Sequence, residues 1–335
     1  MEILNRQVID EAKGPLNLYI GFEPSRSPSI GYLSLLKVLA DLIKTGKYVT
    51  TILIADVHVV MGKGHQMKKR NRERVAYYQF IISLILKHLG VPRTAYAYRL
   101  GSGFQLDCEY MTDLLGLMTV MRISDAKRAV SEVIKEEKDP IMSTVIYPLM
   151  QIVDEISLGA DVELGGMDQR KIFTASLDFK HRLKSGNSEY DSRIKDLAYI
   201  LNPLIPSLRK GSKMSSSDPN GKIGFLDTDE EIATKIQKAY CLDQDCDLTT
   251  NPCLAIMKYI VFPILGDGEK RFGSWTDNSG YNRYDHFLLA WAGGGMKAQC
   301  LKATVIACLN TILNPIREEL FENINIYDQA YPPEN

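Results

Sequence analysis

In the first half of the chain, short apolar runs alternate with longer segments that have helical spacing. Leu16 to Ile20 and the β-branched run Thr50 to Ala55 are each typical of a buried strand. Between them, Ile30 to Ile43 carries leucines at helical spacing and is followed by Thr45-Gly46, a helix-ending pair. A helix joining two buried strands predicts a βαβ unit, and hence a parallel sheet.

The second half of the chain has a different, mostly helical pattern. The first half adds expected helices at 72–89 and 107–119, and an expected strand, Asp161 to Leu164, that leads into Gly165-Gly166. Beyond Leu226, helical spacing dominates at 229–240, 252–262, 284–291 and 298–321. We therefore predict an α/β fold in which a Rossmann-type parallel-sheet catalytic domain (1–225) precedes an all-helical domain (226–335). The last dozen residues are expected to form a frayed tail.

Composition narrows the class of protein only moderately. The 335 residues are 45% hydrophobic and 24% charged with a net charge near −1, so no strong overall basicity announces a nucleic-acid binder. The N-terminus lacks the apolar core of a signal peptide, and no apolar run approaches the ~18 residues of a membrane span. The six cysteines form no Cys-x-x-Cys pair and no metal-ligand spacing with the five histidines. We expect reduced thiols, a cytoplasmic location, no membrane contact and no metal site.

Two separate segments suggest a nucleotide site. The first is the turn from Gly21 to Tyr32, which runs from a strand into a helix N-terminus, where phosphates bind in open parallel sheets. Alone it is weak evidence, because glycines after a strand are usually turn residues. The second is Lys213-Met214-Ser215-Ser216-Ser217, which could fold over a triphosphate and stabilise its charge, or could be a solvated linker.

A third segment places polar groups on one side of a helix. Tyr147, Gln151 and Asp154 are spaced i, i+4 and i+7, so they share a face that carries a phenol, an amide and a carboxylate. Either this face lines a ligand pocket, or it is exposed while its apolar neighbours pack.

Taken together, the motifs resemble those of tyrosyl-tRNA synthetases of the archaeal and eukaryotic type, which are class I aminoacyl-tRNA synthetases. The Lys213–Ser217 pentad is similar to the mobile loop motif of that class, and Pro28-Ser29-Ile30-Gly31-Tyr32 to its His-x-Gly-His region. The similarity continues in three further segments: Ala55-Asp56-Val57-His58, Tyr147 to Asp154, and Gly165 to Lys171. It extends from about Tyr19 to Tyr240 and more weakly to Pro315-Ile316-Arg317.

The resemblance implies a role for each matching residue. Tyr19 and Asp154 would bind the phenolic hydroxyl of tyrosine, and Tyr147, Gln151 and Gln169 its α-ammonium, in a pocket lined by Gln105 and His58. The implied ATP-binding residues are Gly21, Glu23, Ser29, Gly31, Tyr32, Gly166, Asp168, Lys213 and Met214. Lys213 would follow the charge of the departing pyrophosphate, and Ser215, Ser216 and Ser217 would shape the catalytic loop.

The same resemblance implies the reaction and the partners. ATP, with Mg²⁺, would activate L-tyrosine to tyrosyl-adenylate, and the tyrosyl group would pass to the 3′-end of tRNA(Tyr), without a permanent cofactor. A homodimer would form through the insertion at about 107–143, and the helical domain would bind the anticodon. Two basic clusters, 68–74 and 122–128, are candidate contacts for acceptor-stem phosphates or solvated helix faces.

The chain departs from the family pattern at two positions. Ser29 stands where the first motif histidine is expected, and Cys300 where relatives have an aspartate that reads the first anticodon base. Two alternatives therefore stay open: a catalytically impaired, synthetase-like RNA-binding or regulatory protein, and a tryptophanyl-tRNA synthetase, which shares the fold and the loop. An unrelated nucleotidyltransferase is a remote third.

Overall fold

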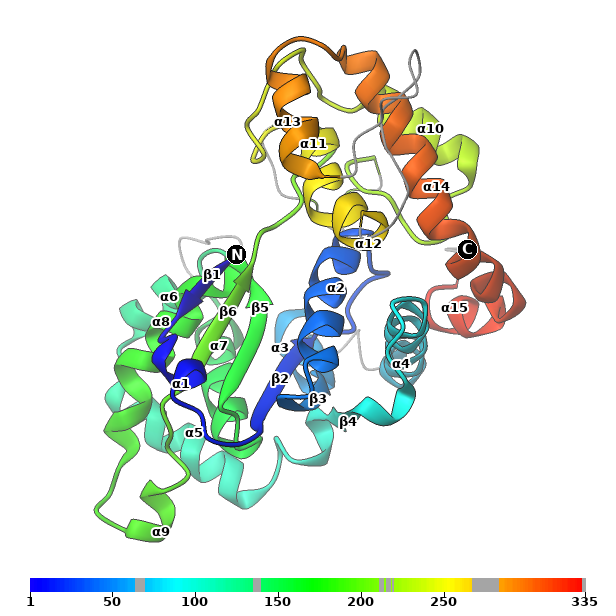
Figure 1. Ribbon diagram of the computed structural model, residues 1–335. Helices are drawn as coiled ribbons and strands as arrows, with labels where there is room; N and C mark the ends of the chain where they lie inside the picture. The colour runs from blue at the N-terminus through cyan, green and yellow to red at the C-terminus, as the bar shows by residue number, and fades with distance from the viewer. Residues whose placement is uncertain are drawn as a thin grey trace.

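A parallel sheet forms the centre of the molecule. The computed structural model describes residues 1–63, 70–134, 140–210, 214, 218, 220–266 and 283–332. Within these residues a six-stranded sheet has the order β1-β6-β5-β2-β3-β4, in which only β1 runs antiparallel to its neighbour (Figure 1). The strands are β1 (Glu2–Leu4), β2 (Leu16–Phe22), β3 (Tyr48–Ile54), β4 (Tyr96–Leu100), β5 (Val162–Gly166) and β6 (Ala198–Asn202). The predicted Rossmann-type α/β fold is confirmed.

Helices cover both faces of this sheet and continue beyond it. Those of the first two hundred residues are α1 (Gln7–Asp10), α2 (Gly31–Lys44), α3 (Asp56–Lys63), α4 (Asn71–His88), α5 (Cys108–Val120), α6 (Ile123–Val130), α7 (Met142–Ser157), α8 (Arg170–Phe179) and α9 (Ser188–Asp191). Those that follow are α10 (Asp229–Lys238), α11 (Pro252–Ile256), α12 (Phe262–Leu265), α13 (Tyr284–Ala292), α14 (Ala298–Glu322) and α15 (Ile324–Ala330). A π-helical turn, Met257–Val261, joins α11 to α12.

Neighbouring side chains of the central strand β2 belong to two different hydrophobic cores, one on each face of the sheet. Leu18 and Ile20 of β2 belong to a core with α2 and α4, whereas Tyr19 between them belongs to a second core with α5, α7 and α8. The alternation follows from the period of two in a strand, which sends neighbouring side chains to opposite faces. Glu163 is paired in register with Tyr19, so both side chains project from the same face of the sheet. This face carries the candidate site.

The helices after residue 225 pack onto the first domain. α14 contacts α4, and the π-helical turn contacts α2, as the yellow and orange helices show above α2 in Figure 1. One cluster of buried side chains extends from the sheet through α2 into α10, α11 and α14. The domain boundary near 225 stays a prediction, since the hydrophobic core continues across it.

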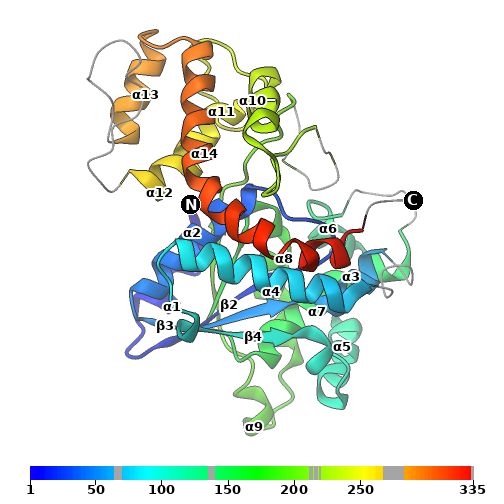
Figure 2. The ribbon, with the colours of Figure 1, turned by 90° about the vertical axis from the view of Figure 1, so that its right-hand side faces the viewer.

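The expectation of a frayed C-terminal tail is wrong for residues 324–332. α15 lies beside α4 in Figures 1 and 2, and the Tyr77 ring contacts those of Tyr327 and Tyr331 with centroids 5.4 and 5.6 Å apart. Arg70 and Arg74, from the predicted basic cluster, donate hydrogen bonds to the carbonyls of Gln329 and Ala330. Aromatic packing and these charge-assisted bonds hold the terminus in place.

Among the helices that the described residues form, none combines the length and the apolar character that crossing a bilayer requires.

Candidate active site

A cavity of about 410 Å³ opens beside the carboxyl ends of β2 and β5. The connections diverge at these two strands, because β3 and β4 follow on one side of β2 while β5 and β6 lie on the other. Open parallel sheets bind ligands at such a switch point. Fourteen of the predicted site residues line this cavity: Tyr19, Gly21, Glu23, Ser29, Gly31, Tyr32, His58, Tyr147, Gln151, Asp154, Gly166, Asp168, Gln169 and Met214. Residues that are far apart in the sequence are therefore brought together.

The deepest polar group in the cavity is the carboxyl group of Asp154, which is 1% exposed. Its Oδ1 accepts hydrogen bonds from Gln105 Nε2 at 2.7 Å and from the Tyr110 hydroxyl at 3.0 Å. Nearby, the buried Tyr19 hydroxyl makes no hydrogen bond of standard geometry among the described residues, and the Glu163 carboxyl group of the adjacent strand lies close to it. A buried hydroxyl without a full hydrogen bond is costly, so this end of the cavity favours a ligand that has its own polar group.

Burial sets the protonation states around Asp154. It raises the pKa of Asp154 to about 8, although the Gln105 and Tyr110 hydrogen bonds oppose the shift. His58 Nε2 lies 3.8 Å from Asp154 Oδ2, and burial lowers the pKa of His58 to about 4. His58 is therefore neutral at neutral pH. A ligand hydroxyl can pair with Asp154 in either form, since a phenol both donates and accepts.

One predicted pocket residue lies behind the cavity wall. Gln105 is fully buried and does not line the cavity; it contacts Asp154 and, at 3.3 Å, His58 Nδ1. The expectation that Gln105 lines the pocket is therefore corrected, because its amide supports Asp154 from behind. Tyr110 has a similar place in α5 and was not predicted. No sequence signal identifies it, since its partner Asp154 lies in another helix.

Three neutral side chains around the cavity each donate a hydrogen bond to a carboxylate. The Tyr147 hydroxyl donates to Glu23 Oε2 at 3.2 Å, and Gln151 Nε2 to Glu163 Oε1 at 3.1 Å. Gln169 Nε2 donates to Asp168 Oδ1 at 3.4 Å. The single hydroxyl hydrogen of Tyr147 and one N–H of each amide are used in these bonds, and the hydroxyl oxygen and the two amide oxygens remain available as acceptors. This set suits a ligand with several N–H donors, such as an ammonium group.

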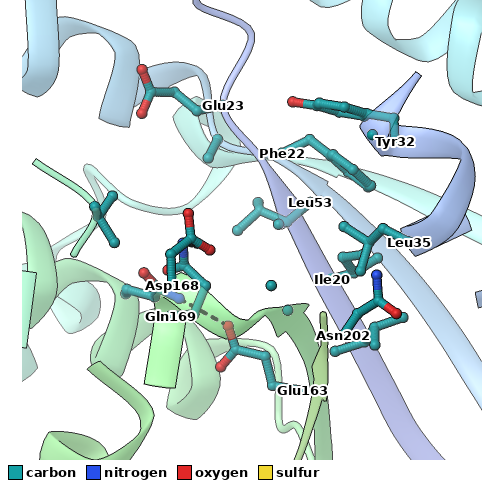
Figure 3. A pocket seen from close by; sticks show the side chains of 18 of the residues that line it. Ile20, Phe22, Glu23, Tyr32, Leu35, Leu53, Glu163, Asp168, Gln169 and Asn202 are labelled. Carbon is teal, nitrogen blue, oxygen red and sulfur yellow. Dashed lines mark hydrogen bonds between the residues drawn. The ribbon is translucent and has the colours of Figure 1, made fainter. Parts of the chain in front are cut away.

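Glu163 is the main site residue that the sequence prediction missed. It lines the cavity and is 2% exposed, and Figure 3 shows its carboxylate extending from β5 on the side of the cavity where Asp168 and Gln169 lie. A dashed line in the figure marks the hydrogen bond that the Glu163 carboxylate accepts. A glutamate inside the apolar strand Val162–Gly166 is a detectable signal, because a buried charge in a strand calls for a partner.

A buried ion pair lies behind this wall. Lys180, 1% exposed, donates a 2.9 Å hydrogen bond to Glu155 Oε2, and Ser176 and Tyr199 donate to the same oxygen. Glu155 follows Asp154 in α7 and is itself 1% exposed. The charge of Lys180 is thus committed to Glu155, away from the cavity-lining carboxylates.

The other end of the cavity has the features of a phosphate or nucleotide site. Ser29 is buried and forms an isolated bridge with Gly224, which closes the turn before α2. A Cβ at Gly166 would lie 2.7 Å from Asp168 Oδ1 and 3.0 Å from Leu204 Cδ2, so a larger residue there would displace both side chains. Tyr32 stacks on Phe22 with centroids 5.3 Å apart, and both are visible at the top of Figure 3. Backbone and aromatic surface are therefore available to a flat, charged ligand.

Several predicted residues fall outside this description. Lys213 and Ser215 to Ser217 lie outside the described residues, as do Lys68 and Lys69 of the first basic cluster. Met214 is described; its backbone N–H donates to the Ile205 carbonyl, and it lines the cavity. Within the described part of the chain, no group of three His, Cys, Asp or Glu side chains could hold a metal ion.

Three features are typical of a nucleotide-binding protein of the Rossmann class: the order of the parallel strands, the cavity at the switch point between β2 and β5, and the glycines at the nucleotide end of that cavity. Comparison with known proteins narrows that class. The family model described as tRNA synthetases class I (W and Y) matches residues 11–314. The chain therefore belongs to the class I tRNA synthetase family that comprises the tryptophan and tyrosine enzymes.

Relatives within this family carry more specific names. The cytoplasmic tyrosine–tRNA ligase of Saccharomyces cerevisiae is 33% identical over 96% of this chain and 82% of its own length. The cytoplasmic tyrosine–tRNA ligase of Gallus gallus is also 33% identical, but the chain spans only 58% of that longer protein. A tyrosyl-tRNA synthetase of Archaeoglobus fulgidus, solved with L-tyrosine, is 28% identical and has a TM-score of 0.79 over 94% of this chain and 93% of its own.

Proposed function

We propose that this protein is a tyrosine–tRNA ligase, which activates L-tyrosine with ATP and transfers the tyrosyl group to tRNA(Tyr). The observation that carries the proposal is that the Asp154 carboxyl group and the Tyr19 hydroxyl both line the buried end of the cavity and lie close enough that, in addition to burial, the charge of Asp154 raises the pKa of Tyr19. A substrate phenol would supply the hydrogen bond that the Tyr19 hydroxyl lacks and would hydrogen-bond Asp154. Phenylalanine would leave both groups unsatisfied; selection of tyrosine over phenylalanine is already established for tyrosyl-tRNA synthetases.

The rest of the cavity suits the reaction. The substrate ammonium would be held by the acceptor atoms of Tyr147, Gln151 and Gln169, so that its carboxylate faces the nucleotide end. That carboxylate attacks the α-phosphate of ATP, which gives tyrosyl-adenylate and releases pyrophosphate; a ribose hydroxyl of the tRNA then attacks the acyl carbon. No protein nucleophile is required, so catalysis rests on positioning and on charge stabilisation by Lys213. Mg²⁺ would enter with ATP as part of the substrate.

The two alternative functions fit the site less well. A tryptophan enzyme must accommodate an indole, which has one N–H donor and no acceptor at its edge. The hydroxyl of Tyr19 together with Asp154 suits a group that both donates and accepts. A catalytically impaired RNA-binding relative is favoured only by Ser29, and the other cavity-lining residues of the predicted site are in place.

A dimer is part of the proposal. Large apolar side chains are exposed along α5 and near the starts of α6 and α7, which lie in or beside the predicted insertion. They are Leu106, Met111, Leu115, Met118, Ile123, Ile141 and Met142. An apolar surface of this kind is typical of a subunit interface. We infer that a second copy of the chain covers it. A cytoplasmic location is proposed from the names of the yeast and chicken relatives.

Tyrosine-dependent ATP–pyrophosphate exchange by the purified chain tests the proposed activity. We expect exchange with L-tyrosine and only background exchange with L-phenylalanine or L-tryptophan. Lys213→Ala should abolish most of it, because the lysine charge is needed as pyrophosphate departs. ATP–pyrophosphate exchange that depends on tryptophan instead of tyrosine would favour a tryptophanyl-tRNA synthetase. Absence of exchange with any amino acid would favour the impaired relative.

A further inference from the structure

Carboxylates greatly outnumber cations around the candidate tyrosine pocket. Asp154, Glu155 and Glu163 are each at most 2% exposed, whereas Lys180 is the buried lysine that the described residues place beside them. His58 contributes no positive charge, because burial lowers its pKa to about 4. Lys180 is bound to Glu155 at 2.9 Å. The pocket therefore holds more buried carboxyl groups than cations, and burial raises the pKa of both Asp154 and Glu163. A cation bound beside one of these groups would favour its charged form and offset that charge.

Within this group, Glu163 has one oxygen without a full hydrogen bond. Its Oε1 accepts the Gln151 amide, whereas its Oε2 is buried, makes no hydrogen bond of standard geometry among the described residues, and has the Tyr19 hydroxyl nearby. Asp154 accepts two hydrogen bonds on Oδ1; Glu155 accepts three on Oε2, although its Oε1 is likewise buried without a partner among the described residues. Glu163 also lines the cavity, whereas Glu155 does not. Of the two glutamates with a buried oxygen that lacks a full hydrogen bond, Glu163 is thus the one that lines the space a substrate would fill.

Glu163 also determines how Gln151 faces the cavity. A carboxylate oxygen only accepts hydrogen bonds, so the Gln151 amide must turn its NH₂ group toward Glu163. The amide oxygen is then left for a donor in the cavity. With a neutral, apolar side chain at position 163, the amide could rotate and present its NH₂ group, which would repel an ammonium.

We propose that Glu163 is a specificity-determining residue for the α-ammonium of the amino-acid substrate, both as its counter-charge and by fixing the Gln151 amide. The inference rests on the proposed function and adds to it, because the residues that the sequence motifs assign to the ammonium, Tyr147, Gln151 and Gln169, are all neutral. Neutral acceptors can satisfy the hydrogens of a buried cation, but they do not balance its charge. Glu163 would supply that balance from β5.

Two ligands that differ only in the ammonium separate this role from a structural one. Tyrosinol carries a phenol and an ammonium; 3-(4-hydroxyphenyl)propan-1-ol carries the same phenol without the ammonium. Their dissociation constants are measured by calorimetry for the wild type, Glu163→Gln and Asp154→Asn. Glu163→Gln is nearly isosteric and keeps an acceptor for Gln151, so it removes mainly the charge. Asp154→Asn is the matched control, since it alters the phenol end of the same pocket.

We expect Glu163→Gln to raise the dissociation constant of tyrosinol by about ten-fold or more, while that of the ammonium-free alcohol changes by less than about two-fold. Asp154→Asn should weaken both ligands by similar factors, and Glu163→Asp should recover part of the tyrosinol affinity because it restores the charge. Equal weakening of both ligands by Glu163→Gln, or of neither, would overturn the role of Glu163. Failure of the wild type to bind tyrosinol would instead overturn the proposed function, and this inference with it.

Discussion

The amide of Gln105 donates a 2.7 Å hydrogen bond to Oδ1 of Asp154, and both side chains are almost completely buried. Gln105 comes from the loop before α5, whereas Asp154 lies in α7. Each side chain therefore restricts the other, and Asp154 is held in one orientation from behind. The carboxylate that would recognise the substrate phenol depends on a residue that does not itself line the cavity.

Gln105→Leu should accordingly raise the KM for tyrosine. The substitution removes a donor that lowers the pKa of Asp154 and leaves its carboxyl group free to rotate. Loss of one such hydrogen bond corresponds to about a ten-fold increase in KM, with kcat changed much less. Exchange kinetics measure both constants. Gln7→Leu, at an exposed position in α1, is the control; a Gln105→Leu enzyme with the wild-type KM would show that the bond does not matter.

The raised pKa of Asp154 predicts a pH-dependent difference in stability. Its folded-state pKa is about 8 and its ordinary value is 3.8, so between these values the folded chain keeps a proton that the unfolded chain releases. Rising pH therefore lowers the free energy of unfolding across this window, and the loss is complete above about pH 8. Asp154→Asn has no titrating group at this position, so its stability does not show this pH-dependent loss.

Urea unfolding of the wild type and Asp154→Asn from pH 4 to pH 8 tests this sign. The free energy of unfolding of Asp154→Asn, relative to that of the wild type, should increase steadily with pH. Glu163, whose pKa burial and the charge of Glu155 also raise, is present in both proteins; the smaller part of its shift that Asp154 causes is lost in the variant and changes the difference in the same direction. Stability curves that stay parallel over the whole range would contradict the assignment.

The proposed dimer predicts that a charge on the apolar surface of α5 separates the subunits. Leu115 is 57% exposed within that surface, so Leu115→Glu should convert a dimer to a monomer in sedimentation experiments. Leu289→Glu is the matched control, because Leu289 in α13 is 70% exposed and lies outside the insertion. A wild-type chain that sediments as a monomer would refute the proposal directly.

Cys300 predicts weakened reading of the first anticodon base. It is exposed near the N-terminus of α14, where the family resemblance places an aspartate. A thiol is a weak acceptor and does not replace the two oxygens of a carboxylate. Cys300→Asp should therefore sharpen discrimination by about ten-fold in kcat/KM among tRNA transcripts that differ at that base. Identical selectivity of the two proteins would count against this assignment.

Local patterns in the sequence predicted much of the fold. The first strand and helix, the strand at 50–55 and the long helix at 298–321 are confirmed within a few residues as β2, α2, β3 and α14. β4 and β6 were missed. The residues of β4 are largely exposed or half-buried and do not form an apolar run, so β4 has little local signal and depends on its sheet neighbours. β6, by contrast, is fully buried and its apolar run is followed by Asn202-Pro203, so its signal was present in the sequence and was overlooked.

The site was predictable where one helix face or one family motif carried it. The spacing of Tyr147, Gln151 and Asp154 was enough to place them together, and all three line the cavity. The supporting groups could not be inferred in this way. Glu155 is paired with Lys180, which follows it by 25 residues and belongs to another helix, and Tyr110 reaches Asp154 across 44 residues. Tertiary contacts of this kind have no local sequence pattern.

Transfer of tyrosine to tRNA by the purified chain tests the central claim most directly. The wild-type protein is incubated with ATP, Mg²⁺, a tRNA(Tyr) transcript and one labelled amino acid, and aminoacylated tRNA is measured over time. The account predicts accumulation of tyrosyl-tRNA, with phenylalanine and tryptophan remaining at background. Tryptophan esterified in place of tyrosine, or no aminoacylation with any of the three, would contradict it.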